Sequence, residues 1–159
     1  MPSHPIPPVF NADSKILILG SFPSVKSREE KFFYAHPQNR FWKVLAAVFS
    51  DAVPVSVEEK KTFLYSHGIA LWDVIAYCDI EGSSDGSIRN VKANDISLVL
   101  NNCRIEKIFA NGRTAEKLYQ KYIEPVAGRK AVYLPSTSPA NAACSLERLK
   151  EIWGNTILK

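Results

Sequence analysis

The chain has 159 residues, of which 46% are hydrophobic, so it can bury the core of one domain but is too short for two ordinary ones. It carries 20 Lys and Arg against 16 Asp and Glu, and the resulting charge of +4 allows a polyanionic partner without requiring one. Its three cysteines are too scattered for a zinc or iron–sulfur site, and no apolar run approaches the ~18 residues of a membrane span. We therefore predict one reduced, cytoplasmic domain over residues 1–159, with an extended or frayed lead-in at residues 1–12 and no membrane association.

The first predicted strand covers residues 16–19, whose sequence ILIL is typical of a strand buried on both faces of a parallel sheet. A long loop rich in aromatic, proline and amide residues follows Gly20. Apolar side chains then recur with the spacing of a core-facing helix, which predicts a helix over residues 40–49 with Asn39 as its N-cap.

The later elements continue the alternation of helix and strand. One long segment is rich in Gly, Ser, Asp and Asn without a clear period, and such segments are more often working loops than filler. In chain order we predict a capping-box helix over residues 56–66, a strand at 69–74, this irregular loop at 75–94, a short helix capped at 94 or 95 that ends near 100, a strand at 107–110, a helix over 114–122, a strand at 131–134, and a C-terminal helix capped by Ser145.

Strands that alternate with helices predict an α/β fold, a three-layer sandwich with a four-stranded, mostly parallel central sheet flanked by helices. Ligands of such sheets bind at the carboxyl ends of the strands. Turn formers, small hydroxyl residues and amides follow the predicted strands, at residues 20–24, 76–77, 111–113 and 135–139. One rim of the sheet is therefore expected to hold a polar ligand.

The common cofactor and nucleophile motifs do not occur in these loops. The first loop has neither GxxxxGK[ST] nor GxGxxG, and the chain has no GxSxG elbow. Of the three histidines, only His36 lies among polar loop residues, which leaves too few ligands for a catalytic metal. We predict neither a metal nor a cofactor.

Aromatic side chains instead gather in one segment beside basic ones. Phe22 and Tyr34 lie in the predicted loop, whereas helical spacing already explains Phe41 and Trp42 as core residues. Flat apolar faces next to positive charges suit a base that has been turned out of a nucleic acid. The basic neighbours are Lys26, Arg28, Arg40 and Lys43.

Three motifs, GSFPS at residues 20–24, YAHPQNRFWKVL at 34–45 and LPSTSPANA at 134–142, resemble the uracil-DNA glycosylase superfamily. Together with EGSSDGSIRN at residues 81–90 they are most similar to its hypoxanthine-DNA glycosylase (DNA-deoxyinosine glycosylase) branch, with likeness also to the mismatch-specific uracil branch. The resemblance implies a monofunctional enzyme of base excision repair that flips a deaminated base, hypoxanthine first of all, and hydrolyses its N-glycosidic bond to leave an abasic site. It also implies a DNA partner and no metal or cofactor.

The resemblance also implies a catalytic residue. The superfamily usually has Asp or Asn where this chain has Phe22, and phenylalanine can neither orient nor deprotonate water. In the hypoxanthine branch, the residue that matches Asn39 is taken as the catalytic amide. A dissociative departure of the base needs little base strength and mainly a water held beneath C1′. We therefore expect Asn39 to be catalytic, and the alternative is that it only caps the helix.

Base-binding residues follow from the same motifs. Tyr34 matches the aromatic residue that stacks on the flipped base, and backbone amides of the first loop would meet the polar edge of that base. Ser84 and Asp85 lie in the loop typical of the hypoxanthine branch, where base recognition and plain loop capping remain equal alternatives. The predicted base-binding set is Gly20, Ser21, Phe22, Pro23, Ser24, Tyr34, Ser84 and Asp85.

DNA contacts are expected from the last loop, whose hydroxyls and backbone N–H groups suit phosphates, and from Arg113 at the start of a helix. Ala140 is a slight wedge, so extrusion of the base would depend on the weakness of the damaged pair. The predicted DNA-binding set is Arg113, Ser136, Thr137, Ser138, Pro139, Ala140 and Asn141.

Two alternatives remain open. The enzyme could remove uracil or another deaminated pyrimidine, or Phe22 could mark a lost activity and leave a module that binds lesions without cutting. In each case we expect a monomer, associated with the nucleoid if the cell is prokaryotic.

Overall fold

The computed structural model describes residues 6–79 and 89–158. Within these residues the centre of the fold is a four-stranded sheet in the order β2-β1-β5-β6, and all three of its pairings are parallel. The predicted α/β fold with a parallel central sheet is therefore confirmed. The strands are β1 (Ile16–Gly20), β2 (Ile69–Asp73), β5 (Lys107–Asn111) and β6 (Val132–Leu134).

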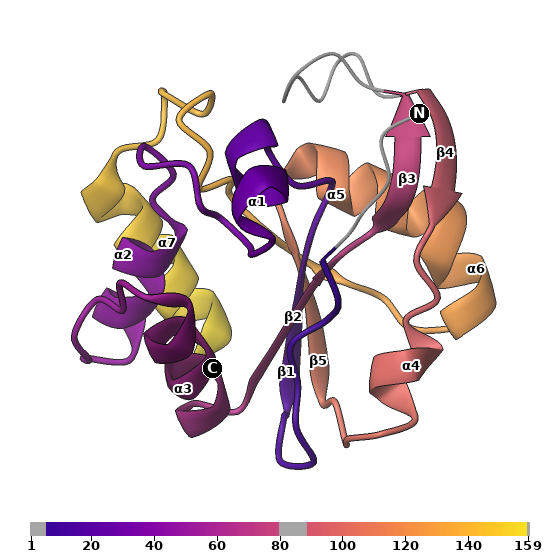
Figure 1. Cartoon of the computed structure of the whole chain (residues 1–159), viewed down its shortest axis with the longest axis horizontal. Helices are drawn as coiled ribbons and strands as arrows, with labels where there is room; N and C mark the ends of the chain where they lie inside the picture. The colour runs from indigo at the N-terminus through magenta and orange to yellow at the C-terminus, as the bar shows by residue number, and fades with distance from the viewer. Residues whose placement is uncertain (1–5, 80–88, 159) are drawn as a thin grey trace.

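Helices cover both faces of this sheet, as Figure 1 shows. On one side lie α2 (Phe41–Val48), α3 (Val57–Ser66) and α7 (Leu146–Ile157), and on the other lie α4 (Ser97–Leu100), α5 (Arg113–Leu118) and α6 (Glu124–Ala127). Helix layers on both faces explain why Leu17, Ile18 and Leu19 of β1 are all fully buried. Among the described residues, none of the helices is both long and apolar enough to cross a membrane.

Two predicted helix starts are confirmed in detail. The Ser56 hydroxyl accepts a hydrogen bond from the Glu59 N–H, and the Glu59 carboxylate accepts one from the Ser56 N–H, both at 3.0 Å, so the capping box is complete. The Ser145 hydroxyl accepts from the Arg148 N–H at 3.1 Å and begins α7. These caps place α3 and α7 where the sequence predicts them.

Two predicted loops contain regular structure. The segment after β1 folds into α1 (Val25–Glu30), and the segment predicted as an irregular loop at 75–94 begins and ends with the antiparallel strands β3 (Ile75–Asp79) and β4 (Arg89–Ala93). The β3–β4 pairing shifts register twice, and such irregularity removes the strict alternation by which a strand is identified in a sequence.

Three predicted helices have different boundaries in the structure. The helix predicted over residues 114–122 is α5 followed by a π-helical turn, η2 (Tyr119–Ile123), and then by α6. Helix α4 begins at Ser97, slightly later than predicted, and the predicted cap Asp95 accepts from the Ser97 N–H at 3.0 Å through its Oδ1. Helix α2 begins at Phe41 with Arg40 in the N-cap position, one residue later than predicted, while Asn39 Oδ1 accepts from the Phe41 N–H and so supplies the predicted side-chain cap.

Candidate active site

The candidate site is a pocket of about 310 Å³ at the carboxyl ends of the central strands. The last residues of β1, β2 and β5 all line it, namely Gly20, Asp73 and Asn111. Parallel strands bring their carboxyl ends to one rim, so residues distant in sequence meet there. The other lining residues are Ser21, Phe22, Pro23, Ser24, Ser27, Phe33, Tyr34, His36, Asn39, Ser136, Thr137, Ser138, Pro139 and Ala140.

Asn39 lies at the N-terminus of α2, where two donors meet its side-chain oxygen. Asn39 Oδ1 accepts from the Phe41 N–H at 3.0 Å and from the Thr137 hydroxyl at 2.8 Å. Asn39 is half-buried and lines the pocket. The side chain therefore satisfies the start of the helix and faces the site at once, so helix capping and a role in the pocket are compatible.

Hydrogen bonds between Asn111 and Thr137 connect the end of β5 to the loop between β6 and α7, next to Asn39. The Thr137 N–H donates to Asn111 Oδ1 at 3.2 Å, and Asn111 Nδ2 donates to Thr137 Oγ1 at 3.1 Å. Asn111 Nδ2 also donates to the Tyr34 hydroxyl at 3.2 Å. Thr137 is fully buried and Asn111 nearly so, and polar groups at such depth are stable only when paired in this way.

Tyr34 forms one wall of the pocket and is held in an unusual conformation. Its φ is 51°, which costs a residue other than glycine about 1–2 kcal/mol. Its ring stacks on Phe41, with centroids 3.9 Å apart and planes 13° from parallel. Phe41 thus covers one face of the ring and fixes its plane, which prepares Tyr34 to stack on a flat ligand.

Asp73 lies beside Gly20, because the two residues are partners in the pairing of β1 and β2. A Cβ atom at Gly20 would overlap Asp73 Oδ1 and lie 2.8 Å from the Tyr34 hydroxyl, so only glycine leaves room for both groups. Asp73 is 3% exposed, and it is a carboxylate that lines the pocket. Sequence reasoning missed it, although a charged residue at the end of the apolar run IALWD was a usable signal.

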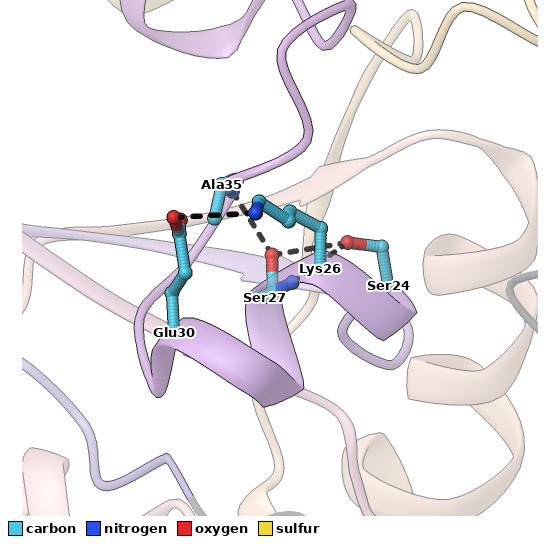
Figure 2. Close-up of polar contacts among 5 residues, drawn as sticks. All are labelled: Ser24, Lys26, Ser27, Glu30 and Ala35. Atoms are coloured by element: carbon cyan, nitrogen blue, oxygen red, sulfur yellow. Dashed lines mark hydrogen bonds and ion pairs between the residues drawn. The ribbon is translucent and has the colours of Figure 1, made fainter.

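The first loop is fastened by serine hydroxyls, as Figure 2 shows. Ser24 caps α1 by accepting from the Ser27 N–H at 3.1 Å, and its hydroxyl also bonds to the Ser27 hydroxyl at 3.2 Å. Ser27 Oγ in turn accepts from the Ala35 N–H at 2.9 Å, next to Tyr34. An ion pair of 3.7 Å between Lys26 and Glu30 spans the same helix. Ser24 therefore lines the pocket and at the same time caps α1.

The other aromatic and imidazole groups of the pocket are also constrained. Phe22 is only 9% exposed, and the Arg28 guanidinium lies 5.3 Å from its ring centroid. His36 Nδ1 accepts from the Gln38 N–H at 3.1 Å, so a neutral His36 carries its proton on Nε2. His36 was not predicted as a site residue, and Asn111 was predicted only as part of the rim segment 111–113 that is expected to hold a polar ligand.

Arg40 binds the loop between β6 and α7 through hydrogen bonds to its backbone. Its guanidinium donates to the Thr137, Ser138, Asn141 and Cys144 carbonyl oxygens, and its backbone N–H donates to the Thr137 oxygen at 3.1 Å. Arg40, one of the basic neighbours of the aromatic segment, therefore directs its donors to this loop. The charge of Arg40 neutralises four carbonyl dipoles of the loop.

Within the loop, the hydroxyls mostly stabilise local turns. Ser136 Oγ accepts from the Ser138 N–H, and Ser138 Oγ accepts from the Ala140 N–H, both at 3.1 Å. Asn141 does not line the pocket, because its Nδ2 donates to the Ser136 oxygen at 3.0 Å and closes the loop. Pro139 and Ala140 are exposed at the tip, so DNA contact by this loop stays a prediction that its shape permits.

Arg113 lies outside the pocket lining. Its side chain is 65% exposed, donates to Glu116 at 2.8 Å and lies over the Tyr133 ring at 3.8 Å. The hydrogen bond to Glu116 raises the pKa of the Arg113 guanidinium, which therefore stays charged. The predicted base contacts Ser84 and Asp85 lie outside the described residues. Within those residues, no cluster of three or more His, Cys, Asp or Glu side chains could hold a metal ion.

Comparisons with known proteins agree with this geometry. The sequence profile of the Uracil DNA glycosylase superfamily matches residues 7–155. A protein of Methanosarcina acetivorans named hypoxanthine DNA glycosylase is 33% identical over 91% of this chain and 92% of its own, and a protein of the same name from Methanosarcina barkeri is 29% identical over 96% of both chains. An NMR structure from Methanosarcina acetivorans, proposed to be a uracil DNA glycosylase, superimposes with a TM-score of 0.80 at 32% identity over 95% of this chain and 93% of that one. With its profile match, its relatives and its fold in agreement, the chain belongs to the uracil-DNA glycosylase superfamily.

Proposed function

We propose that this protein is a monofunctional DNA glycosylase that flips deoxyinosine out of a duplex and hydrolyses the bond between hypoxanthine and its sugar. The observation that carries the proposal is the meeting of Asn39 with the Tyr34 ring in one pocket, beside an exposed loop tip at Pro139 and Ala140. A volume of about 310 Å³ is at the small end of ligand pockets, which begin at about 300 Å³, and suits one base. The relatives named hypoxanthine DNA glycosylase support this choice of base.

In the proposed reaction the bond between C1′ and the purine breaks, and its electron pair leaves with the base. The oxygen of a water molecule bonds to C1′, and the proton that this water loses is taken up by the departing base. Asn39 would hold the water, and Tyr34 would support the flat face of the purine. Backbone N–H groups near Ser21 and Phe22 would stabilise the negative charge that develops on the base, each by about 2–4 kcal/mol.

Asp73 is suited to the polar edge of the base. Hypoxanthine presents a ring N–H donor at N1, which a carboxylate can accept, whereas N1 of adenine is an acceptor that would face Asp73 unfavourably. Uracil presents a comparable ring N–H, so the same group accommodates the alternative substrate. This contact separates hypoxanthine from adenine and uracil from cytosine, the undamaged parent of each. Hypoxanthine comes first because of the named relatives.

The test is a panel of duplexes that each carry one deoxyinosine, deoxyuridine or deoxyxanthosine, followed by alkaline cleavage of abasic sites. We expect strand cleavage at deoxyinosine, and we expect Asn39→Ala to lose turnover while it keeps its affinity for DNA. Asn155→Ala is a matched control, because Asn155 is exposed on α7 and does not line the pocket. Cleavage at deoxyuridine alone would favour the pyrimidine alternative, and binding without any cleavage would indicate a lesion-binding module.

A further inference from the structure

The two amides that line the pocket, Asn39 and Asn111, have only one orientation that satisfies their neighbours. A backbone N–H can only donate, so the atom of Asn39 that meets the Phe41 N–H must be the oxygen, and the atom of Asn111 that meets the Thr137 N–H must be the oxygen as well. Asn111 therefore directs its Nδ2 toward Thr137 Oγ1. Because that hydroxyl accepts from Asn111, its own proton is available to Asn39 Oδ1, 2.8 Å away.

This chain of hydrogen bonds occupies the oxygen of the predicted catalytic amide. A carbonyl oxygen has two lone pairs, and Asn39 Oδ1 already accepts from the Phe41 N–H and the Thr137 hydroxyl. Within the described part of the chain, Asn39 Nδ2 has no hydrogen-bond partner, and it is not among the side-chain atoms that are both buried and unpartnered. The accessible polar atom of this side chain is therefore a donor.

We infer that Thr137 is a positioning residue that turns the Asn39 carboxamide so that Nδ2 donates to the oxygen of the attacking water. This inference rests on the proposed function and names the atom that performs the step. A donor to the water oxygen fixes its position beneath C1′ but cannot take its proton, which suits a reaction in which the base departs before the water attacks. Arg40 supports the arrangement because it holds the Thr137 carbonyl while Thr137 holds Asn39.

The orientation can be measured without any activity. In the labelled full-length protein, we expect a scalar coupling across the hydrogen bond between the Phe41 amide nitrogen and the Asn39 Cγ carbon. We expect this coupling to weaken in Thr137→Val, which lacks the second donor to Oδ1. Absence of the coupling in the unmodified protein would overturn the inference, whatever the enzyme proves to act on.

The activity test compares Thr137→Val with Thr137→Ser in single-turnover cleavage of a deoxyinosine duplex. Loss of one hydrogen bond to the amide is expected to slow the valine variant roughly tenfold, and serine should recover most of the rate. Because Thr137 is fully buried and its hydroxyl is paired with Asn39 and Asn111, its loss should leave DNA affinity unchanged. Thr156→Val is the matched control, because the Thr156 hydroxyl donates to the Ile152 carbonyl on α7, outside the pocket lining, and its loss should leave the rate unchanged. A valine variant as fast as the unmodified enzyme would overturn the inference while the proposed function stands.

The pH profile of Asn39→Asp shows whether this side chain donates a hydrogen bond to the attacking water or accepts one from it. The ionised carboxylate of this variant has no proton to donate, so we expect an inactive enzyme at neutral pH whose activity returns as the carboxyl is protonated in acid. Were the group to act as an acceptor, the variant would be active at neutral pH and lose activity in acid. Tyr34, His36 and Asp73 line the same pocket and Arg40 adjoins it, so each rate is divided by that of the unmodified enzyme at the same pH.

Discussion

At the scale of single residues, the site depends on close approach between groups from separate strands, the first loop and α2. Gly20 lets the Asp73 carboxylate and the Tyr34 hydroxyl reach the end of β1, and Phe41 fixes the ring of Tyr34 from behind. None of these contacts involves neighbours in the sequence. A single added methyl group is therefore enough to displace the pocket wall.

We expect Gly20→Ala to abolish most of the glycosylase activity. The new Cβ would overlap Asp73 Oδ1 and crowd the Tyr34 hydroxyl, so both groups must move from the positions that the base would contact. A shift of about 1 Å costs on the order of a hundredfold in rate. The measurement is single-turnover cleavage together with the melting temperature.

Gly154→Ala is the matched control for that variant. Gly154 lies in α7, and a Cβ at this position would meet no atom within 4 Å. Alanine should therefore leave activity unchanged and stabilise the helix by up to about 1 kcal/mol. Equal loss of activity in both variants would contradict the steric explanation.

At the scale of elements, the N-terminus of α2 and the loop between β6 and α7 form one unit. Arg40 donates to four carbonyl oxygens of that loop, and Asn39 accepts from its Thr137 hydroxyl. Hydrogen bonds that involve a charged donor are the stronger class, so this arginine fixes the loop relative to the helix. The exposed tip at Pro139 and Ala140 is thereby presented from a rigid base.

We expect Arg40→Met to lower the melting temperature by several degrees. Methionine keeps an apolar stem but removes the charged donor from all four carbonyls, although those of Thr137, Ser138 and Asn141 keep a backbone N–H donor. We expect a cost of about 3 kcal/mol, or roughly 6–12 °C for a chain of this size. Lys43→Met is the control, because Lys43 is exposed on the same helix and is expected to change the melting temperature little. Thermal unfolding followed by circular dichroism gives both values, and similar melting temperatures would contradict the role assigned to Arg40.

At the scale of the whole molecule, the sheet brings its polar strand ends to one rim, and exposed cations around that rim are candidates for phosphate contacts. Arg113 lies at the carboxyl end of β5, and its exposed pair with Glu116 is weak enough to exchange for a phosphate. Arg104 is also exposed but precedes β5, at the opposite end of the sheet. The two residues differ in position rather than in charge.

We therefore expect Arg113→Gln to reduce the salt dependence of DNA binding. Each phosphate contact contributes about 0.9 to the slope of log K against log salt, so the slope should fall by about that amount. Arg104→Gln changes the net charge equally and should leave the slope unaltered. Equal slopes for the two variants, measured by titration of a duplex at several salt concentrations, would show that Arg113 touches no phosphate.

Several features of this protein could be determined from the sequence because local patterns carry them. The run ILIL, the capping box at Ser56 and the cap at Ser145 each depend on neighbours a few residues apart, and the elements they predict are present. The three motifs that resemble the superfamily are also local, and they led to a family that the profile match bears out. The irregular β3 and β4 pair escaped prediction because its register shifts remove that local signal.

The tertiary structure alone decided which polar atoms face the pocket. Asp73, Asn111 and Thr137 are far apart in the sequence, and the parallel pairing of β1, β2, β5 and β6 brings the ends of these strands to one rim. The Asn39 side chain could be named from its motif, but its orientation depends on a hydroxyl 98 positions away. Sequence patterns report the period of a helix or strand, whereas the direction of a buried hydrogen bond is set by partners that only folding brings together.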